Sequence, residues 1–262
     1  MSTEMIDFLS GSGRRCIAVF EAYLDESGTH DEAPVLCVAA YVGKREQWLK
    51  YEKEWLPIIN KSRVSCCHAV EAECDRLRPS LATAIDKGRF FGVTYSVKPD
   101  IFNSHATDQI KNEIGNAYAV CAVYCAFAIC RVAYEIKLGP ISFIYEMGQP
   151  NDELVIRSLK TLALHNDPKM NIASATLGRK KECSPLAAAD FLAHVTGTHS
   201  YNANDASWYE YLTHPSRVLH MDLSKDRLIE TSKIVDKYID IRRKTKEDKR
   251  IARWIEKYNS KD

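Results

Sequence analysis

The sequence of 262 residues has almost no net charge, because 36 Lys and Arg offset 35 Asp and Glu to give +1. This excludes binding to nucleic acid through overall charge, so a phosphate-binding surface has to be a local patch. The sequence also lacks an internal repeat, a flexible linker and, in residues 1–15, the apolar core of a signal peptide. Its nine cysteines are odd in number and scattered. We therefore expect reduced thiols and a cytoplasmic protein.

Long apolar runs are scarce as well. The longest covers residues 117–130, is rich in Ala and Cys, and is stopped by Arg131. We expect it to be too short to span a membrane and to form a helix buried in a core. Paired Cys-x-x-Cys spacing is also missing around residues 66–74, so the cysteines there are not typical of a zinc site.

The chain contains apolar segments of two kinds, some typical of strands and some with helical spacing. Five segments predict strands, at residues 16–24, 34–42, 90–97, 141–145 and 170–177. Helical spacing predicts helices at 45–59, 79–87, 108–138, 152–165 and 184–198. The fold class is therefore α/β, a mixed five-stranded sheet flanked by helices, formed by residues 1–200. Residues 201–262 are expected to add an ordered loop and a helical C-terminal extension packed on this core.

The first strand ends in two carboxylates and a glycine. Asp25, Glu26, Ser27 and Gly28 follow directly on an apolar segment. Such residues are typical of a turn, and this interpretation stays open. However, a carboxylate at the edge of an apolar sheet is costly unless it is paired, protonated or bound to a cation.

Two further carboxylates lie in similarly apolar settings. Glu146 ends the fourth predicted strand, and Asp190 lies in the apolar helix that begins near Pro185. If the first and fourth strands are parallel neighbours, their carboxyl ends share one edge, where ligands of open α/β sheets bind. Three carboxylates at one point would suit Mg²⁺ or Mn²⁺, and two such ions could cleave a phosphodiester.

Four stretches carry a resemblance to a known family. They are Tyr23-Leu24-Asp25-Glu26-Ser27-Gly28, Cys67-His68-Ala69, Ile144-Tyr145-Glu146 and Pro185-Leu186-Ala187-Ala188-Ala189-Asp190-Phe191. Together they resemble the family known as domain of unknown function 3800, over about residues 18–198. That resemblance implies a ribonuclease H-like fold and nuclease activity, in a family found largely in bacteria and their phages.

The resemblance also implies roles for individual residues. Asp25 would be the central metal ligand, Glu146 the second and Asp190 the third. Glu26 would join them only if the strand bends, because neighbouring side chains of a strand point to opposite faces. The family commonly has a Gln where this sequence has Ala187, which leaves the support of the Asp190 carboxylate without its usual residue.

Three other residues are candidates for the same site. His68 is predicted either to contact a phosphate or move a proton there, or to be a partly buried, hydrogen-bonded histidine. Lys180 and Lys181 belong to a basic run shortly before Asp190. A basic run of this kind is either a solvated surface or a partner for the charge on a scissile phosphate.

The sequence therefore favours a nuclease that depends on a divalent metal and acts on DNA or RNA. An alternative is a catalytically inactive ribonuclease H-like module that binds or regulates, which the altered helix motif and the neutral charge favour. A third hypothesis is metal-dependent chemistry on a small phosphorylated ligand. A membrane partner is not expected, and a homo-oligomer is compatible with the sequence.

Overall fold

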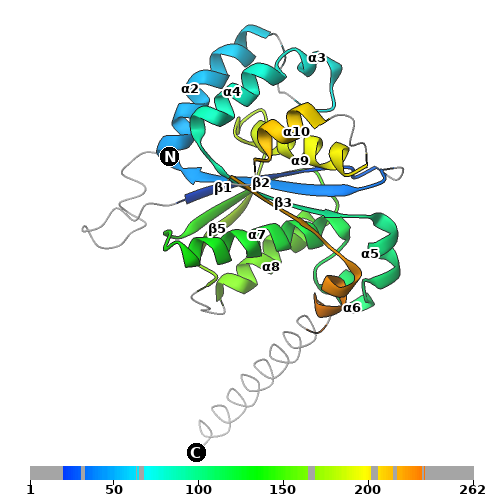
Figure 1. The fold of residues 1–262 in the computed structure, drawn as a ribbon. Coiled ribbons are helices and arrows are strands. Elements are labelled where there is room, and N and C mark those ends of the chain that lie inside the picture. The colour runs from blue at the N-terminus through cyan, green and yellow to red at the C-terminus, as the bar shows by residue number, and fades with distance from the viewer. Residues whose placement is uncertain are drawn as a thin grey trace, which may run out of the picture.

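The computed structural model describes residues 20–30, 33–62, 64, 68–164, 169–201, 206–214, 217–231 and 233. Its centre is a six-stranded sheet with the spatial order β5-β4-β1-β2-β3-β6 (Figure 1). The strands are β1 (Phe20–Ser27), β2 (Leu36–Lys44), β3 (Phe91–Val97), β4 (Ile141–Glu146), β5 (Ile172–Gly178) and β6 (Val218–Asp222).

The strand directions identify the fold. β2 is antiparallel to both β1 and β3, while β4 runs parallel to β1 and β5 runs parallel to β4. This order of three antiparallel strands extended by two parallel ones is that of a ribonuclease H-like fold. The predicted α/β class and the predicted parallel pairing of the first and fourth strands are thus confirmed.

The sheet has one strand more than predicted. β6 comes from a segment that we expected to be a loop, and it pairs in parallel with β3. Its apolar residues Val218, Leu219 and Met221 do not alternate strictly with polar ones, so the sequence gives little strand signal. The free backbone groups at the edge of β3 supply the pairing that defines this strand. The sheet therefore continues past the predicted boundary at residue 200.

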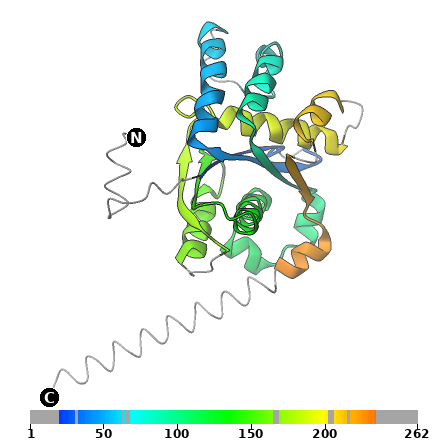
Figure 2. The same cartoon turned by 60° about the vertical axis from the view of Figure 1, so that its left-hand side comes forward.

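Helices cover both faces of the sheet (Figures 1 and 2). One face is covered by α7 (Ala117–Glu135) and α8 (Asp152–Leu164). The other is covered by α9 (Leu186–Tyr201), with α2 (Arg45–Ser62), α4 (Arg78–Gly88) and α10 (Ala206–Leu212) around it. Three further helices are short: α3 (Ala72–Asp75), α5 (Pro99–His105) and α6 (Asp108–Glu113), and residues 225–231 are also helical.

The predicted single helix over residues 108–138 is wrong, because the chain breaks between α6 and α7. Gly115 has a φ of +122°, which L side chains rarely adopt, so the first helix cannot continue through it. The next residue, Asn116, then caps α7 by accepting a hydrogen bond of 3.0 Å from the amide of Ala119. The helical spacing of apolar residues continues on both sides of Gly115, so the sequence pattern does not reveal the break.

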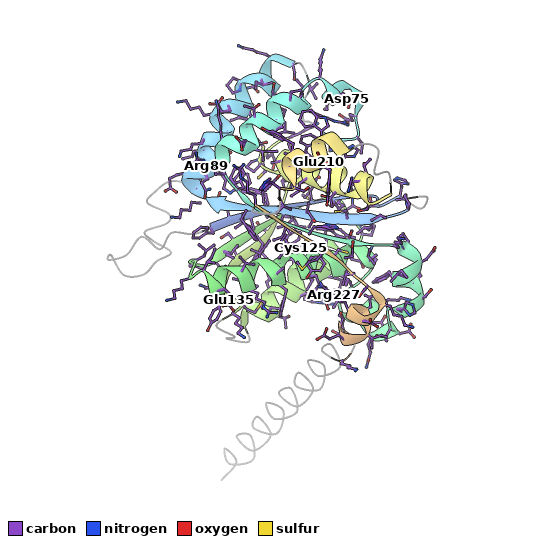
Figure 3. The ribbon with its side chains drawn as sticks, in the orientation of Figure 1. Asp75, Arg89, Cys125, Glu135, Glu210 and Arg227 are labelled. Carbon is purple, nitrogen blue, oxygen red and sulfur yellow. The ribbon has the colours of Figure 1, made fainter. Side chains whose placement is uncertain are left out.

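α7 is the main helix of its face. It has 19 residues and is long and apolar enough to cross a membrane by length and composition, so the prediction that it is too short is wrong. A core helix meets the same criteria, and its predicted burial is confirmed by the residues packed against β2 and β3. Figure 3 labels Cys125 on its sheet-facing side, where the thiol lies 3.3 Å from the carbonyl oxygen of Val38.

The opposite face has an aromatic core. The Trp48 ring of α2 stacks on Phe90 with centroids 3.8 Å apart, and its indole N–H donates to the carbonyl of Glu21. These contacts fix α2 and the start of β3 to β1. The predicted lead-in at residues 1–15, the thiols of Cys66 and Cys67, and the extension beyond residue 233 lie outside the described residues.

Candidate functional site

Three elements bring the predicted carboxylates together. Asp25 follows Leu24, which forms the last pair between β1 and β4, and Glu146 is the last residue of β4. Because β1 and β4 are parallel, both residues lie at the same edge of the sheet. Asp190 lies in α9, which packs across β1 and β2 above that edge. We call Asp25, Glu146 and Asp190 the carboxylate site.

The centre of the carboxylate site is the ammonium group of Lys180. Its Nζ lies 2.8 Å from Oδ2 of Asp25, 2.6 Å from Oε2 of Glu146 and 3.0 Å from Oδ2 of Asp190. The Lys180 side chain is only 5% exposed and that of Asp25 only 1%. Three carboxylates from separate elements therefore share one buried cation.

Lys180 reaches the site from the turn between β5 and α9. The amides of Glu182 and Cys183 both donate to the carbonyl of Arg179, which closes this turn. Its neighbours Arg179 and Lys181 are exposed. Of the predicted basic run, the structure brings only Lys180 to the carboxylates, and Lys181 lies at the surface.

Glu26 belongs to the opposite face of β1. Tyr23 packs in the core on the α9 side and Leu24 in the core on the α7 side, so alternation places Asp25 toward α9 and Glu26 toward α7. The predicted conflict between these two acids is therefore seen in the structure. Glu26 still lies within electrostatic reach of Glu146 and Lys180.

His68 also contacts the ammonium group. Its Nδ1 lies 3.0 Å from Nζ of Lys180. Since an ammonium can only donate, Nδ1 is the acceptor in this arrangement. His68 thus lies half-buried beside the carboxylate site, which agrees with either of its two predicted roles.

The Asp190 carboxylate is supported in a way that the sequence did not reveal. The backbone amide of Ala69 donates a hydrogen bond of 2.8 Å to Oδ2 of Asp190. The carbonyl of Ala69 accepts in turn from Nη2 of Arg78, at 2.7 Å. At the position where the resembled family commonly has Gln, Ala187 is buried. A loop held by Arg78 thus supports Asp190, and no side-chain motif signals a backbone donor.

The site carries an excess of negative charge in a buried setting. Burial, followed by the charges of Asp190 and Glu26, raises the pKa of Asp25 well above its usual value, although Lys180 opposes this. Burial and the charge of Glu146 raise the pKa of Glu26 to about 7. For Lys180, burial lowers the pKa, but the three carboxylates outweigh it and the net shift is upward.

The donor set fits a hard divalent cation, although its present arrangement is that of an ammonium site. Carboxylate oxygens are the ligands that Mg²⁺ and Mn²⁺ prefer. Oδ2 of Asp25 already lies 2.8 Å from Nζ of Lys180, while the buried Oε2 of Glu26 accepts no hydrogen bond from the described residues. Within the described ranges, however, no group of three or more His, Cys, Asp or Glu is arranged to hold a metal ion.

A cavity of about 580 Å³ lies farther along the same edge of the sheet. Strand pairing places Asp25, Ala39, Thr94 and His220 in one row across β1, β2, β3 and β6. Three strand spacings separate the ends of this row, or about 14 Å. The cavity is lined by apolar side chains, by the carboxylate of Asp222, and by cationic, hydroxyl and aromatic side chains that include Lys98, Lys225, Ser96, His199, Tyr209 and His220.

Comparison with known proteins gives little further guidance. No family model matches the chain, and no curated protein matches it. Among solved structures, it is similar to one described as the complex of PCNA and RNase HII from Archaeoglobus fulgidus. The TM-score is 0.42 and the identity 16%, over 72% of this chain and 78% of that chain. A likeness this weak does not establish the fold, which is assigned from the strand order. Membership of the resembled family stays a prediction.

Proposed function

We propose that this chain is a divalent-metal-dependent nuclease that hydrolyses phosphodiester bonds at the carboxylate site. The observation that carries the proposal is the convergence of Asp25, Glu146 and Asp190 on one cation position. That position lies at the carboxyl edge of two parallel strands in a ribonuclease H-like sheet. Structural ion pairs seldom gather three buried carboxylates around one cation, because each charge costs free energy to desolvate.

Asp25, Glu146 and Asp190 would hold Mg²⁺ or Mn²⁺. When bound there, such an ion lowers the pKa of a coordinated water and stabilises the charge on a phosphate oxygen. Lys180 supplies a positive charge next to the scissile phosphate, where negative charge grows during the reaction. His68, whose Nδ1 lies 3.0 Å from Nζ of Lys180, would exchange a proton with a phosphate oxygen.

A polymeric substrate is supported by the cavity along the same edge. α9 carries Asp190 near its start and His199 near its end, nine residues apart, which is about 14 Å along the helix. A nucleic-acid strand seated on the carboxylate site could therefore continue over Lys98 and Lys225. Phosphate contacts of this kind provide affinity without reading sequence.

The test is cleavage of labelled single- and double-stranded DNA and RNA with Mg²⁺, Mn²⁺ or chelator. Wild type is compared with Asp25→Asn and with Asp86→Asn, a matched control whose carboxylate is 51% exposed and pairs with Arg217 on the surface. We expect metal-dependent cleavage by wild type and by the control, and none by Asp25→Asn. Equal cleavage by all three proteins would trace the activity to a contaminant and contradict the proposal.

One observation favours the second candidate, an inactive module that binds nucleic acid. The position shared by the three carboxylates is filled by the ammonium of Lys180. A module of this kind would bind oligonucleotides in the presence of chelator and cleave none of them with Mn²⁺. Fluorescence anisotropy beside the cleavage assay separates the two candidates.

A further inference from the structure

The ammonium of Lys180 and a divalent cation would need the same oxygens. Oδ2 of Asp25, Oε2 of Glu146 and Oδ2 of Asp190 all face Nζ at 2.6–3.0 Å. A buried ammonium of this kind excludes a second cation from the same position, since like charges repel strongly where water is scarce. Any metal ion held by these carboxylates therefore has to displace the Lys180 side chain.

The position of Lys180 in the fold allows such a displacement. Its backbone lies in the turn that follows β5, and not within a helix or strand. Both neighbours, Arg179 and Lys181, are exposed, so the turn borders solvent. A rotation of the flexible four-carbon side chain would carry Nζ from the carboxylates toward water without unfolding either flanking element.

We propose that Lys180 is an exchangeable internal counterion, which fills the cation position of the metal-free protein and leaves it when a divalent metal ion binds. This inference rests on the proposed function and adds to it a coupling between metal binding and release of the Lys180 ammonium. The displaced ammonium becomes available to a substrate phosphate only when the metal ion is in place. In the metal-free protein it is held by its own carboxylates and contributes little to phosphate binding.

The first test is the affinity for Mn²⁺, measured by titration calorimetry on the full chain. Lys180→Met removes the charge and keeps most of the side-chain length, while Lys181→Met is the matched control at the exposed neighbouring position. We expect Lys180→Met to bind Mn²⁺ about tenfold or more tightly than wild type, and the control to equal wild type. Equal or weaker binding by Lys180→Met would overturn the inference.

The second test leaves Lys180 in place and therefore holds even if Lys180→Met fails to fold. Wild type is treated briefly with an amine-acylating reagent, with and without Mn²⁺, and modification of each lysine is quantified by mass spectrometry. Without metal, we expect Lys180 to be protected and Lys181 to react. With Mn²⁺, Lys180 should approach the rate of Lys181, whereas in Asp25→Asn the ion should change nothing.

The outcomes separate this inference from the proposed function. Binding of Mn²⁺ to wild type with Lys180 still protected would refute the exchange and leave the proposed metal centre standing. Failure of both wild type and Lys180→Met to bind Mn²⁺ would contradict the metal centre and the exchange together. Tighter binding by Lys180→Met together with Mn²⁺-dependent labelling of Lys180 is the result that supports the inference.

Discussion

The backbone amide of Ala69 and the carboxylate of Asp190 are joined by a hydrogen bond of 2.8 Å across 121 residues of sequence. The same oxygen of Asp190 lies 3.0 Å from the ammonium of Lys180. Asp190 is thus held by a loop on one side and by a cation on the other. If the cation is exchanged, the amide of Ala69 is the contact that keeps this carboxylate oriented.

Loss of Arg78 should therefore loosen the carboxylate site from a distance. Arg78 donates to the carbonyl of Ala69 and also pairs with Asp75. Groups that orient metal ligands typically change metal affinity by about 10- to 100-fold when removed. We expect Arg78→Met to weaken Mn²⁺ binding by about tenfold in calorimetry.

The control for this experiment is Arg76→Met, an exposed arginine on the same segment. It should bind Mn²⁺ as wild type does. Partial recovery in Arg78→Lys would identify the bond to the Ala69 carbonyl as the cause. Wild-type affinity in Arg78→Met would show that the loop is held without this side chain.

Glu26 should make stability depend on pH. Its pKa is raised to about 7 by burial and by the charge of Glu146, so the folded protein holds this proton more tightly than the unfolded chain. The stability that this proton contributes is complete at acid pH and is lost as pH rises through about 7. Glu26→Gln keeps a neutral side chain, so it should be more stable than wild type at pH 8, by about 1–3 kcal/mol.

The measurement is urea unfolding at pH 5.5 and at pH 8. The difference between Glu26→Gln and wild type should be smaller at pH 5.5 than at pH 8 and should vanish below about 4.5, the ordinary pKa of Glu, where Glu26 is protonated in the folded and the unfolded chain alike. Glu182→Gln, an exposed acid in the turn that carries Lys180, is the control and should follow wild type at both pH values. A constant difference between Glu26→Gln and wild type would argue against titration of Glu26.

Binding of a nucleic-acid strand should depend on the two lysines that line the cavity. Lys98→Met combined with Lys225→Met removes two cations from its lining. Each phosphate contact contributes to the dependence of binding on salt, so the slope of log K against log salt should fall by about 1.5 for a single strand. Fluorescence anisotropy of an oligonucleotide at several salt concentrations measures this slope.

The matched control for the cavity carries Lys53→Met and Lys111→Met, two exposed lysines on α2 and α6. Its slope should equal that of wild type. If both double variants lower the slope alike, the effect is one of general charge, and the cavity has no particular part in binding.

The cap of α7 should contribute measurably to folding. The side chain of Asn116 accepts from the amide of Ala119 at the start of this helix. Asn116→Ala should lower the free energy of unfolding by about 1 kcal/mol, while Asn116→Asp should retain most of it. Urea unfolding compares the three proteins, and an Asn116→Ala variant as stable as wild type would show that packing alone sets this helix start.

Much of the site could be predicted, because its acids follow clear strand signals. The apolar segments before Asp25 and Glu146 predict strand ends, and parallel pairing brings such ends to one edge. The parts of the site that could not be predicted depend on turns and on backbone atoms. Arg179, Lys180 and Lys181 are equivalent in sequence, and only the shape of the turn selects Lys180 to point inward.

Two features of the fold differ from the prediction, each for its own reason. The helix break at Gly115 is hidden because apolar spacing continues on either side of it, so the pattern reports a buried face and not the helix end. β6 carries a weak pattern because its pairing with β3 defines it more than its own residues do. β6 is thus decided by a neighbour distant in sequence, whereas the helix break has local signals, Gly115 and the capping Asn116.

The ammonium inside the carboxylate site also bears on how the protein is made. A chain whose clustered acids relied on a metal ion for charge compensation would finish folding only after capturing that ion, as small metal-dependent domains do. Here Lys180 belongs to the same chain as the acids and can offset part of their charge from the moment the sheet closes. If the proposed metal centre is correct, folding would not depend on metal supply: folded protein would accumulate while metal is scarce and act once metal returns.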